Sequence, residues 1–435
     1  MQAQALSHES IQSGELNELD TRSLRIALLG YRSNPFSGGQ GVYLKYLSRA
    51  LVKLGHSVDV ISAEPYPELD DTVGLIKLPG LNLFESPNHL WALRPKHLLS
   101  ATDMFEWASM ASGGFPEPFA FGRRLKRYLK NARPGYDIIH DNQSLCHALL
   151  SIQQAYPVLT TIHHPITSDR DIALSNAQDW SERLLIKRWH YFLRMQIKVA
   201  SQLPAILTVS RNSKQDLSKD FRIPAERIRV VYNGIDTDDF FPMRHVASDT
   251  WQLITTASAD QPLKGTRHLL KAFAALLAEY PKLRLTIIGA LKSGGENEKL
   301  IKHLGIQDRI TQRSQLSTSD IRHLYAQSSI AIVPSDYEGF GLPAGEAMAC
   351  GLPVVSTDGG ALPEVLGDAG IVVPAKKPIE LARAIKKLLE NPPARASLAS
   401  RGLERIRTHF CWNRAANETV NFYRHQIHAH RVANG

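Results

Sequence analysis

Short apolar runs that recur along the chain constrain its fold more than any other feature. The first run is LRIALLG at 24–30, and a glycine-containing loop, a stretch with helical spacing at 42–55 and the run SVDVISA at 57–63 follow it. A run that is apolar at nearly every position is typical of a strand covered on both faces of a parallel sheet. A strand, a helix and a second strand in this order predict a right-handed parallel α/β unit.

The same unit returns in both halves of the chain. Further runs of the first half lie at 136–140, 157–162, 205–209 and 228–232, and a second series starts near Trp251. A polar stretch near 236–250 separates the two series. The chain has 435 residues, more than a single hydrophobic core usually supports. We therefore predict an α/β protein of two doubly wound, Rossmann-like domains that face each other across a cleft.

The predicted boundaries follow these patterns. Residues 1–22 are polar and are interpreted as a disordered extension, 23–236 as the first domain, 237–411 as the second domain and 412–435 as a separate terminal segment. The stretch at 81–118 is less regular and rich in proline, which indicates an insertion or a flexible subsite on the domain surface. In doubly wound sheets ligands bind at the carboxyl ends of the strands, so we expect the site between the two domains.

Composition narrows the class of protein. Hydrophobic residues make up 43% of the chain and charged residues 21%, which is ordinary for a globular protein. Three cysteines that lie far apart, Cys146, Cys350 and Cys411, argue against a disulfide framework and favour a reducing compartment. The chain shows no signal-peptide pattern at its start and no apolar run of about 18 residues. We therefore expect a cytoplasmic protein that could still contact the inner face of the membrane.

Several common signatures are missing from the sequence. It contains no GxGxxG, no GxxxxGK[ST], no GxSxG and no HExxH pattern, so the dinucleotide-oxidoreductase and P-loop interpretations lose their main support. It also shows no cluster of metal-ligand residues. We expect no bound metal.

The informative segment is SDYEGFGLPAGEAMACG at 335–351, directly after a buried strand. Glu338 lies in the loop, the glycines at 339 and 341 allow close approach to a ligand, and Pro343 suits the first turn of a helix. A helix amino terminus at this place favours phosphate. Glu338 and Glu346 can then accept hydrogen bonds from sugar hydroxyls and from a ribose diol. The alternative is that both glutamates are only favoured by the helix dipole, which leaves the loop unexplained.

These residues carry a resemblance to a known family. EGFGLPAGEAMACGLPVV with GGALPEV resembles the retaining glycosyltransferases of the GT-B fold, called family 4 or group 1. SGGQGVYLKYLSRAL, YDIIHDNQ, TTIHHP, LTVSRNSKQDL and VVYNGID are similar to further landmarks of the family in the same order. The resemblance covers roughly 24–424. It implies transfer of a hexosyl-type unit with retention from a nucleotide-diphosphate sugar, without metal or other cofactor, to a glycan, lipid-linked or small-molecule acceptor.

The resemblance also implies roles for single residues in the second domain. Glu338 would contact hydroxyls of the donor sugar, and Glu346 would hold the ribose. Lys264 would neutralise the diphosphate, helped by the backbone of Phe340, Gly341 and Leu342. Lys264 could instead be a solvated residue at a helix start, but the helix dipole disfavours a cation there.

In the first domain the resemblance points to a loop and a strand end. Gly39 would let the first loop approach the diphosphate, and His163 would lie near the donor sugar, although a strand-end histidine is often structural. The terminal helix near 412–428 would cross back onto the first domain.

One position departs from the family pattern. The Arg expected five or six residues before Lys264 is replaced by Ser258 and Ala259, and Asp260 adds a negative charge. Either Arg211 or Arg32 supplies the second cation, or the diphosphate is held differently.

Three other interpretations remain. FGRRLKRYLK at 121–130 combines five cations with apolar residues, so it could lie on an anionic membrane or be a solvated helix with a buried apolar face. A sugar-nucleotide epimerase or a phosphorylase could use a similar cleft. A non-catalytic nucleic-acid or ligand-binding protein is a remote alternative that would fit the net charge of +9, but no binding motif or stacking series supports a specific nucleic-acid partner.

Overall fold

A computed structural model describes residues 22–35, 39–86, 88, 93–243, 245–256 and 261–434. Within these residues the first domain contains a seven-stranded parallel sheet with the strand order β3-β2-β1-β4-β5-β6-β7. Its strands are β1 (Arg25–Gly30), β2 (Ser57–Ser62), β3 (Gly74–Lys77), β4 (Ile138–Asn142), β5 (Val158–Ile162), β6 (Ile206–Thr208) and β7 (Ile228–Val230). The predicted extension at 1–22 lies outside the described residues except for Arg22.

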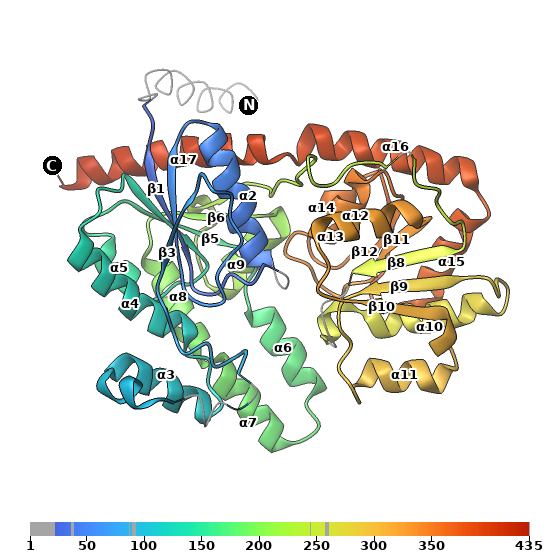
Figure 1. Cartoon of the computed structure of the whole chain (residues 1–435), viewed down its shortest axis with the longest axis horizontal. Helices are drawn as coiled ribbons and strands as arrows, with labels where there is room; N and C mark the ends of the chain where they lie inside the picture. The colour runs from blue at the N-terminus through green and yellow to red at the C-terminus, as the bar shows by residue number, and fades with distance from the viewer. Residues whose placement is uncertain are drawn as a thin grey trace, which may run out of the picture.

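Helices cover both faces of this sheet (Figure 1). The helical elements of the first domain are α2 (Gly39–Lys53), α3 (Ala101–Ala111), α4 (Glu117–Ala132), α5 (Ala148–Ile152), α6 (Thr167–Asn176), α7 (Trp180–Trp189), α8 (Leu193–Gln202) and α9 (Arg211–Asp220), with short 3₁₀ turns η3 (Pro95–Leu99), η4 (His190–Phe192) and η5 (Ala225–Arg227). Strand β1 shows why helices pack on both faces of the sheet. Ala27 and Leu29 belong to one buried cluster, whereas Ile26 and Leu28 belong to the cluster on the opposite face.

The second domain repeats the architecture. Among its described residues a six-stranded parallel sheet has the order β10-β9-β8-β11-β12-β13. The strands are β8 (Gln252–Thr256), β9 (Arg284–Ile288), β10 (Ile310–Arg313), β11 (Ile330–Val333), β12 (Val354–Thr357) and β13 (Ile371–Val373). The helical elements are η6 (Pro262–Lys264), α10 (Thr266–Leu277), α11 (Glu296–Leu304), η7 (Gln307–Arg309), α12 (Thr318–Gln327), α13 (Leu342–Ala349), α14 (Leu362–Leu366), α15 (Pro378–Leu389) and α16 (Pro392–His409), and the terminal helix α17 (Trp412–Asn434) follows them.

The chain returns to the first domain at its end. Helix α16 lies on the second domain, and α17 continues across the top of the first domain (Figure 1). Trp412 and Tyr423 of α17 are buried in the same cluster as residues of α2. The chain passes between the domains near Ile235 and again near Phe410. The backbone N–H of Ile235 donates to the carbonyl of Phe410 at 2.7 Å, which joins these two connections. The predicted fold class, including the crossing helix, is confirmed.

The stretch predicted as irregular contains a helix. Residues 95–111 form η3 and α3, which lie with α6 and α7 in a lobe below the first sheet in Figure 1. Arg124 of α4 holds this stretch, since its guanidinium donates to Asp103 at 2.6 Å and to Glu106 at 2.5 Å. Pro87 and Trp91 lie outside the described residues.

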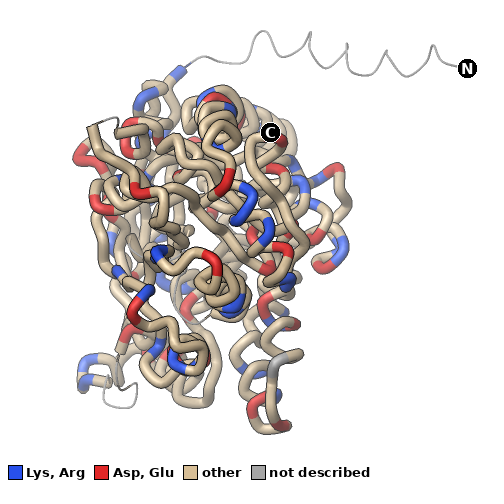
Figure 2. The backbone as a smooth tube through the Cα atoms, turned by 90° about the vertical axis from the view of Figure 1, so that its right-hand side faces the viewer, with Lys and Arg blue, Asp and Glu red and all other residues tan. Residues whose placement is uncertain are grey.

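The basic stretch 121–130 does not present an apolar face to a membrane. It belongs to α4, and its side chains Phe121, Leu125 and Leu129 are buried in the core of the first domain. Of the two interpretations of this stretch, the solvated helix with a buried apolar face is correct. Lys and Arg alternate with Asp and Glu over the side of the molecule that Figure 2 presents. Among the described helices, none combines the length and the apolar character that a membrane crossing requires.

Candidate active site

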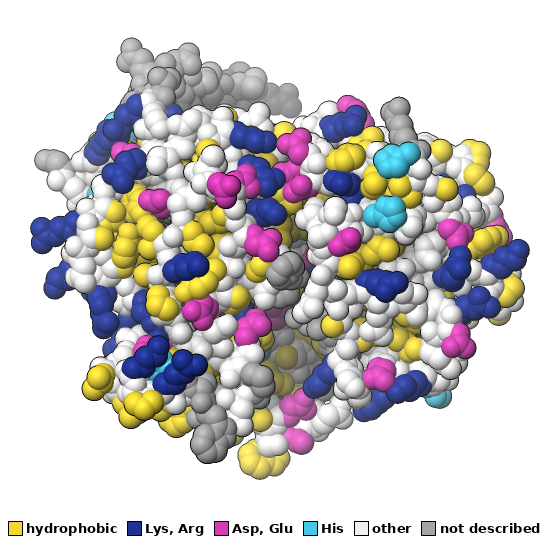
Figure 3. All heavy atoms as spheres, viewed as in Figure 1, with side chains coloured by type: hydrophobic (Ala, Val, Ile, Leu, Met, Phe, Trp, Pro, Cys, Tyr) yellow, Lys and Arg dark blue, Asp and Glu magenta, His cyan; other side chains and the backbone are white. Residues whose placement is uncertain are grey.

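The carboxyl ends of the two sheets meet between the domains. A Cβ atom placed on Gly39, at the start of α2, would lie 3.9 Å from a methyl group of Leu342, at the start of α13. The loop after β11 likewise reaches the end of β5, where Gly339 faces His163. Figure 3 shows a hollow between the two domains on this face of the molecule. The predicted residues Gly39, His163, Glu338 and Leu342 therefore come together from both domains.

Lys264 and Glu338 form an ion pair in the second domain. Nζ of Lys264 lies 2.8 Å from Oε1 of Glu338, and the hydroxyl of Ser335 donates to the same oxygen at 2.9 Å. The side chains keep 21% and 12% of their surface exposed, so both remain accessible to a ligand. Gly265 makes the approach possible, because its φ of +63° is left-handed and a side chain there would collide with the carbonyl oxygen of Pro334.

The amino terminus of α13 lies directly after this pair. Gly341 adopts a φ of +99° and turns the chain into the helix. Phe340 is buried and packs its ring against Phe410 at 5.7 Å, so it anchors the loop while its backbone stays at the helix start. The first N–H groups of a helix lack intrahelical acceptors and favour an anion. The loop around 340–342 thus places hydrogen-bond donors beside Lys264.

Glu346 lies one turn inside α13 and is partly buried. Burial raises the pKa of its carboxyl to about 7. No side-chain hydrogen bond to its carboxylate is found among the described residues, and the hydroxyl groups of a ligand would supply such partners.

His163 is held in place by polar groups of the neighbouring strand end. Its Nε2 lies 2.6 Å from the amide oxygen Oδ1 of Asn142, and its backbone N–H donates to Oε1 of Gln143 at 2.7 Å. The ring of Tyr43 stands edge-on at 4.7 Å. Desolvation and the neighbouring His164 lower the pKa of His163 to about 3. The imidazole is therefore neutral at neutral pH, and because Nε2–H donates to Asn142, Nδ1 remains an acceptor.

Sequence reasoning missed the two amides that position this histidine. Gln143 also donates from Nε2 to the carbonyl of His164 at 2.8 Å, and it does so from a left-handed φ of +55°. A left-handed, non-glycine residue at a strand end is uncommon and is typical of functional loops. The available signal was the pair Asn142-Gln143 directly after the strand in YDIIHDNQ, which is where ligands of a parallel sheet bind.

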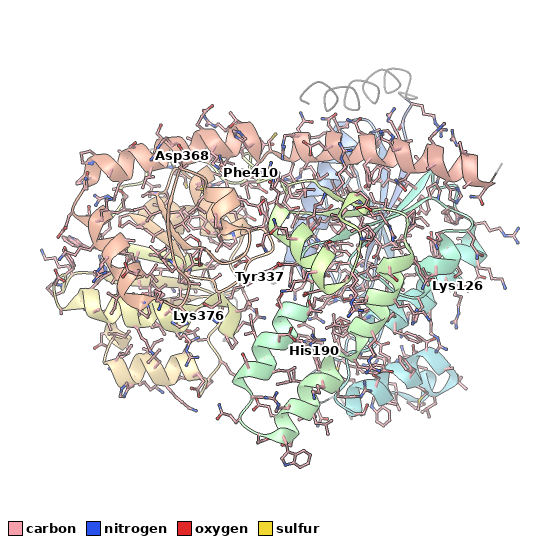
Figure 4. The ribbon with its side chains drawn as sticks, turned by 180° about the vertical axis from the view of Figure 1, so that it is seen from behind. Lys126, His190, Tyr337, Asp368, Lys376 and Phe410 are labelled. Atoms are coloured by element: carbon pink, nitrogen blue, oxygen red, sulfur yellow. The ribbon has the colours of Figure 1, made fainter. Side chains whose placement is uncertain are left out.

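Direct contacts join the two domains beside the site. The hydroxyl of Tyr337 donates to Asp216 of α9 at 2.7 Å, and Figure 4 places Tyr337 between the domains. The carboxylate of Glu364 accepts from the backbone N–H groups of Arg211 and Asn212 at 2.9 and 2.7 Å. Glu364 thus caps the amino terminus of a helix in the opposite domain.

The structure shows where the two arginines predicted as a second cation for the diphosphate lie. Arg32 forms ion pairs with Glu85 at 2.5 Å and Glu117 at 3.2 Å, and it lies over the ring of Phe84. The side chain of Arg211 lines a different cavity between α9 and α17. Residues 258–260, where the family pattern changes, lie outside the described residues.

Two facing Rossmann-like domains, a cation at a helix amino terminus and carboxylates around it define a nucleotide-sugar site of the GT-B type. Residues 37–239 match the family described as Glycosyltransferase Family 4, and residues 240–405 match the family described as Glycosyl transferases group 1. Over 410 residues the chain is 42% identical to the MMP alpha-(1->4)-mannosyltransferase of Mycolicibacterium hassiacum, covering 93% of this chain and 98% of that protein. The chain belongs to the family 4, group 1 glycosyltransferases and transfers a sugar from a nucleotide sugar.

More distant proteins share the whole architecture. The D-inositol 3-phosphate glycosyltransferase of Streptomyces bingchenggensis is 25% identical over 448 residues, covering 96% of this chain and 92% of that protein. The sucrose-phosphate synthase of Thermosynechococcus elongatus has a TM-score of 0.71 at 23% identity and covers 94% of this chain and 100% of that chain. WaaG, described as a glycosyltransferase involved in lipopolysaccharide biosynthesis, has a TM-score of 0.66 at 17% identity, covering 91% of this chain and 98% of that chain. At these structural identities the similarity concerns the fold.

Proposed function

We propose that this protein is a retaining hexosyltransferase that moves a mannosyl unit from a nucleotide-diphosphate sugar to a glycan acceptor and forms an α-(1→4) bond. The relative at 42% identity, named an MMP alpha-(1->4)-mannosyltransferase, supports the mannosyl unit and the linkage. The resemblance of the sequence motifs to those of a retaining family supports retention of the anomeric configuration.

The ion pair between Lys264 and Glu338 is the observation that carries the proposal. In the structure Glu338 neutralises Lys264, with 2.8 Å between Oε1 and Nζ. A diphosphate at the amino terminus of α13 offers Lys264 a stronger anionic partner. When Lys264 pairs with the diphosphate instead, an oxygen of Glu338 becomes free to accept a hydrogen bond from a hydroxyl of the donor sugar. Donor binding and alignment of the sugar are coupled in this way.

The remaining residues complete the donor site. Glu346 accepts hydrogen bonds from the ribose hydroxyls, and the backbone at 340–342 donates to the diphosphate. Gly39 leaves space for the diphosphate between α2 and α13. Nδ1 of His163 accepts a hydrogen bond from a hydroxyl of the donor sugar. Glu346, the backbone at 340–342 and His163 are assigned here because the described residues around them leave a donor or an acceptor of each without a partner.

The reaction on one face of the sugar needs no nucleophile from the protein. The bond between the anomeric carbon and the diphosphate oxygen breaks, and a bond from the acceptor oxygen forms on the same face. The proton of the acceptor hydroxyl passes to the departing diphosphate. Lys264 and the helix amino terminus stabilise the charge that develops on this leaving group, and the two domains hold both substrates in position.

We also propose that transfer does not require a metal ion. The described residues contain no group of three or more His, Cys, Asp or Glu side chains arranged to hold one. Lys264 and the amino terminus of α13 provide positive charge at the place where a metal would otherwise neutralise the diphosphate.

The test is a transfer assay with UDP- and GDP-linked hexoses and a short α-(1→4)-linked mannoside. We expect the product to gain one hexose with the α configuration of the donor, with and without EDTA. The Glu338→Gln variant serves as the inactive control. An inverted product would refute retention, and loss of activity in EDTA that added metal restores would refute metal independence.

An assay without acceptor separates the other enzyme classes. An epimerase would convert the nucleotide sugar itself, and a phosphorylase would release a sugar phosphate when phosphate is added. Either product, formed faster than the glycoside, would overturn the proposed transfer.

A further inference from the structure

A cationic cavity lies on the first domain, outside the candidate active site. It is bounded by α9, β7 and α17 and has a volume of about 1110 Å³. Small-molecule sites in proteins commonly have volumes of about 300–1,000 Å³, so this cavity is large enough for such a ligand. The cations that line it among the described residues are Arg211, Lys214, Lys219, Arg227, Arg229 and Arg414.

Few of these charges are neutralised by the protein itself. The lining contains two carboxylates, Glu226 and Glu418, among the described residues. Glu418 lies 3.1 Å from Nη1 of Arg414. For the side chains of Lys214 and Lys219, no carboxylate of the described residues lies within 4.0 Å, so their charge remains available to a ligand.

Arg414 gives an independent sign that a partner is missing. Its Nε and Nη2 atoms are buried and have no hydrogen-bond partner among the described residues, and other atoms of Arg414 line the cavity. A buried donor without an acceptor destabilises the folded protein, and more so when it belongs to a charged group. Arginine binds phosphate through parallel N–H donors, so an anion would satisfy these atoms once the Arg414 side chain rotates them toward the cavity.

Aromatic rings complete the lining. Tyr232 lies under the guanidinium of Arg414 at 5.8 Å, and Phe422 lies under that of Arg229 at 5.9 Å. Both rings line the cavity. A ligand with a ring beside its charged group can therefore contact an apolar surface and the cations together.

The first turn of α9 separates the cavity from the active site. Arg211 and Lys214 line the cavity, whereas Ser213 faces the other way and donates to the carbonyl of His163 at 2.9 Å. The hydroxyl of Tyr232 donates to Glu364 of the second domain at 3.0 Å. The cavity therefore lies behind the contact that joins the domains, and an anion in it would not occupy the donor site.

We infer that this cavity, which we call the α9–α17 pocket, binds a phosphorylated small molecule through Arg414 and Lys214, with its ring against Tyr232 or Phe422. The alternative is that the cations only prevent β7, at the edge of the sheet, from pairing with another strand. Edge protection needs charge along the strand, but it does not need a concave lining or an arginine with buried unpaired donors.

Calorimetric titration of the whole protein with glucose 6-phosphate tests the inference, with glucose as the uncharged control. We expect saturable binding of the phosphate ester and none of glucose. Lys214→Gln and Arg414→Gln should each weaken the affinity at least about tenfold, since each removes a hydrogen bond between charged groups. Lys126→Gln, an exposed cation of α4 on the same domain (Figure 4), is the matched control and should leave the affinity unchanged.

The outcomes distinguish the sources of the signal. Binding that Lys264→Ala abolishes and Lys214→Gln does not would place the anion in the donor site and overturn the inference. An equal loss in Lys126→Gln would show unspecific attraction to a basic surface and overturn it as well. Absence of binding by the phosphate ester, together with sedimentation on phosphatidylglycerol vesicles that Lys214→Gln weakens, would identify the cations as a lipid contact instead. Because Lys214 lies on the surface of α9, its variant should fold even if Arg414→Gln does not.

Discussion

Replacing Gly339 by alanine tests whether the contact between the two domains belongs to the reacting state. A Cβ atom on Gly339 would lie 2.7 Å from the carbonyl oxygen of His163 and 3.2 Å from Cβ of His164. Ordinary van der Waals contact begins at 3.4 Å, so the loop after β11 has to retreat from β5 by about 0.7 Å. Gly339 is not in the left-handed region, so the backbone itself accepts alanine.

The magnitude follows from this displacement. A misplacement of about 1 Å between reacting groups lowers a rate about 100-fold, so we expect kcat/KM to fall between about 10- and 100-fold, or about 1.4–2.7 kcal/mol. The contact lies between the domains and not inside either core. The melting temperature should therefore stay within about 2 °C of the unchanged protein.

The assay combines steady-state transfer kinetics with thermal unfolding. Gly135→Ala is the control, because a Cβ atom there meets only the end of the flexible Arg25 side chain, at 3.2 Å. A Gly339→Ala protein that is folded and keeps its kcat/KM within twofold would show that the domains do not approach this closely during the reaction. An equal loss in Gly135→Ala would attribute the effect to alanine substitution in general.

Four further substitutions address the charges of the site. Lys264→Ala and Glu338→Gln should each lower kcat at least about 100-fold without unfolding the protein, because each removes a group placed on the leaving group or the sugar; near-native turnover in a folded variant contradicts that placement. Burial raises the pKa of Glu346 from 4.5 to about 7, so the native state keeps a proton that the unfolded chain releases, and stability should fall as the pH rises through that window. Glu346→Gln should abolish that fall, as melting temperatures at pH 5 and pH 8 will show, and an unchanged pH dependence would exclude Glu346 as its source. Glu364→Gln removes the charge that caps α9 across the domain contact and should weaken closure by about 1–2 kcal/mol, seen as a larger radius of gyration by small-angle scattering, whereas an unchanged radius would show that other contacts hold the domains.

Much of the fold could be predicted because buried parallel strands have a recognisable pattern in the local sequence. Runs such as LRIALLG are apolar at nearly every position, and β1 is buried on both faces for that reason. The crossing of α17 was expected from the family resemblance alone, since nothing in the local pattern of 412–434 says which surface it covers. Burial of Trp412 and Tyr423 against α2 is a tertiary contact.

The candidate site was predictable as a set of residues but not as an arrangement. Lys264 and Glu338 are 74 positions apart, and they pair because β8 and β11 are neighbours in the sheet. Asn142 reaches His163 because β4 and β5 are neighbours in the other sheet. Such adjacency depends on strand order, which periodicity along one segment does not contain.

The amphipathic helix α4 also shows that the sequence does not determine which surface an element contacts. Its apolar stripe was clear from the sequence, but a stripe can face lipid or a protein core with equal local propensity. Packing against the first sheet buried Phe121, Leu125 and Leu129. The surroundings of Arg32 and Arg211 were likewise not contained in the sequence: Arg32 pairs with Glu117, and Arg211 lines the α9–α17 pocket.

The sequence by itself determined the two parallel α/β series, the loop that carries Glu338 and the helix start behind it, because these depend on residue type and short spacing. The tertiary structure alone decided which groups meet: Lys264 with Glu338, His163 with Asn142, and Glu364 with the start of α9. The physical reason is that hydrogen bonds and ion pairs act over a few ångströms. Only the order of the strands and the closure of the two domains bring residues far apart in the chain within that range.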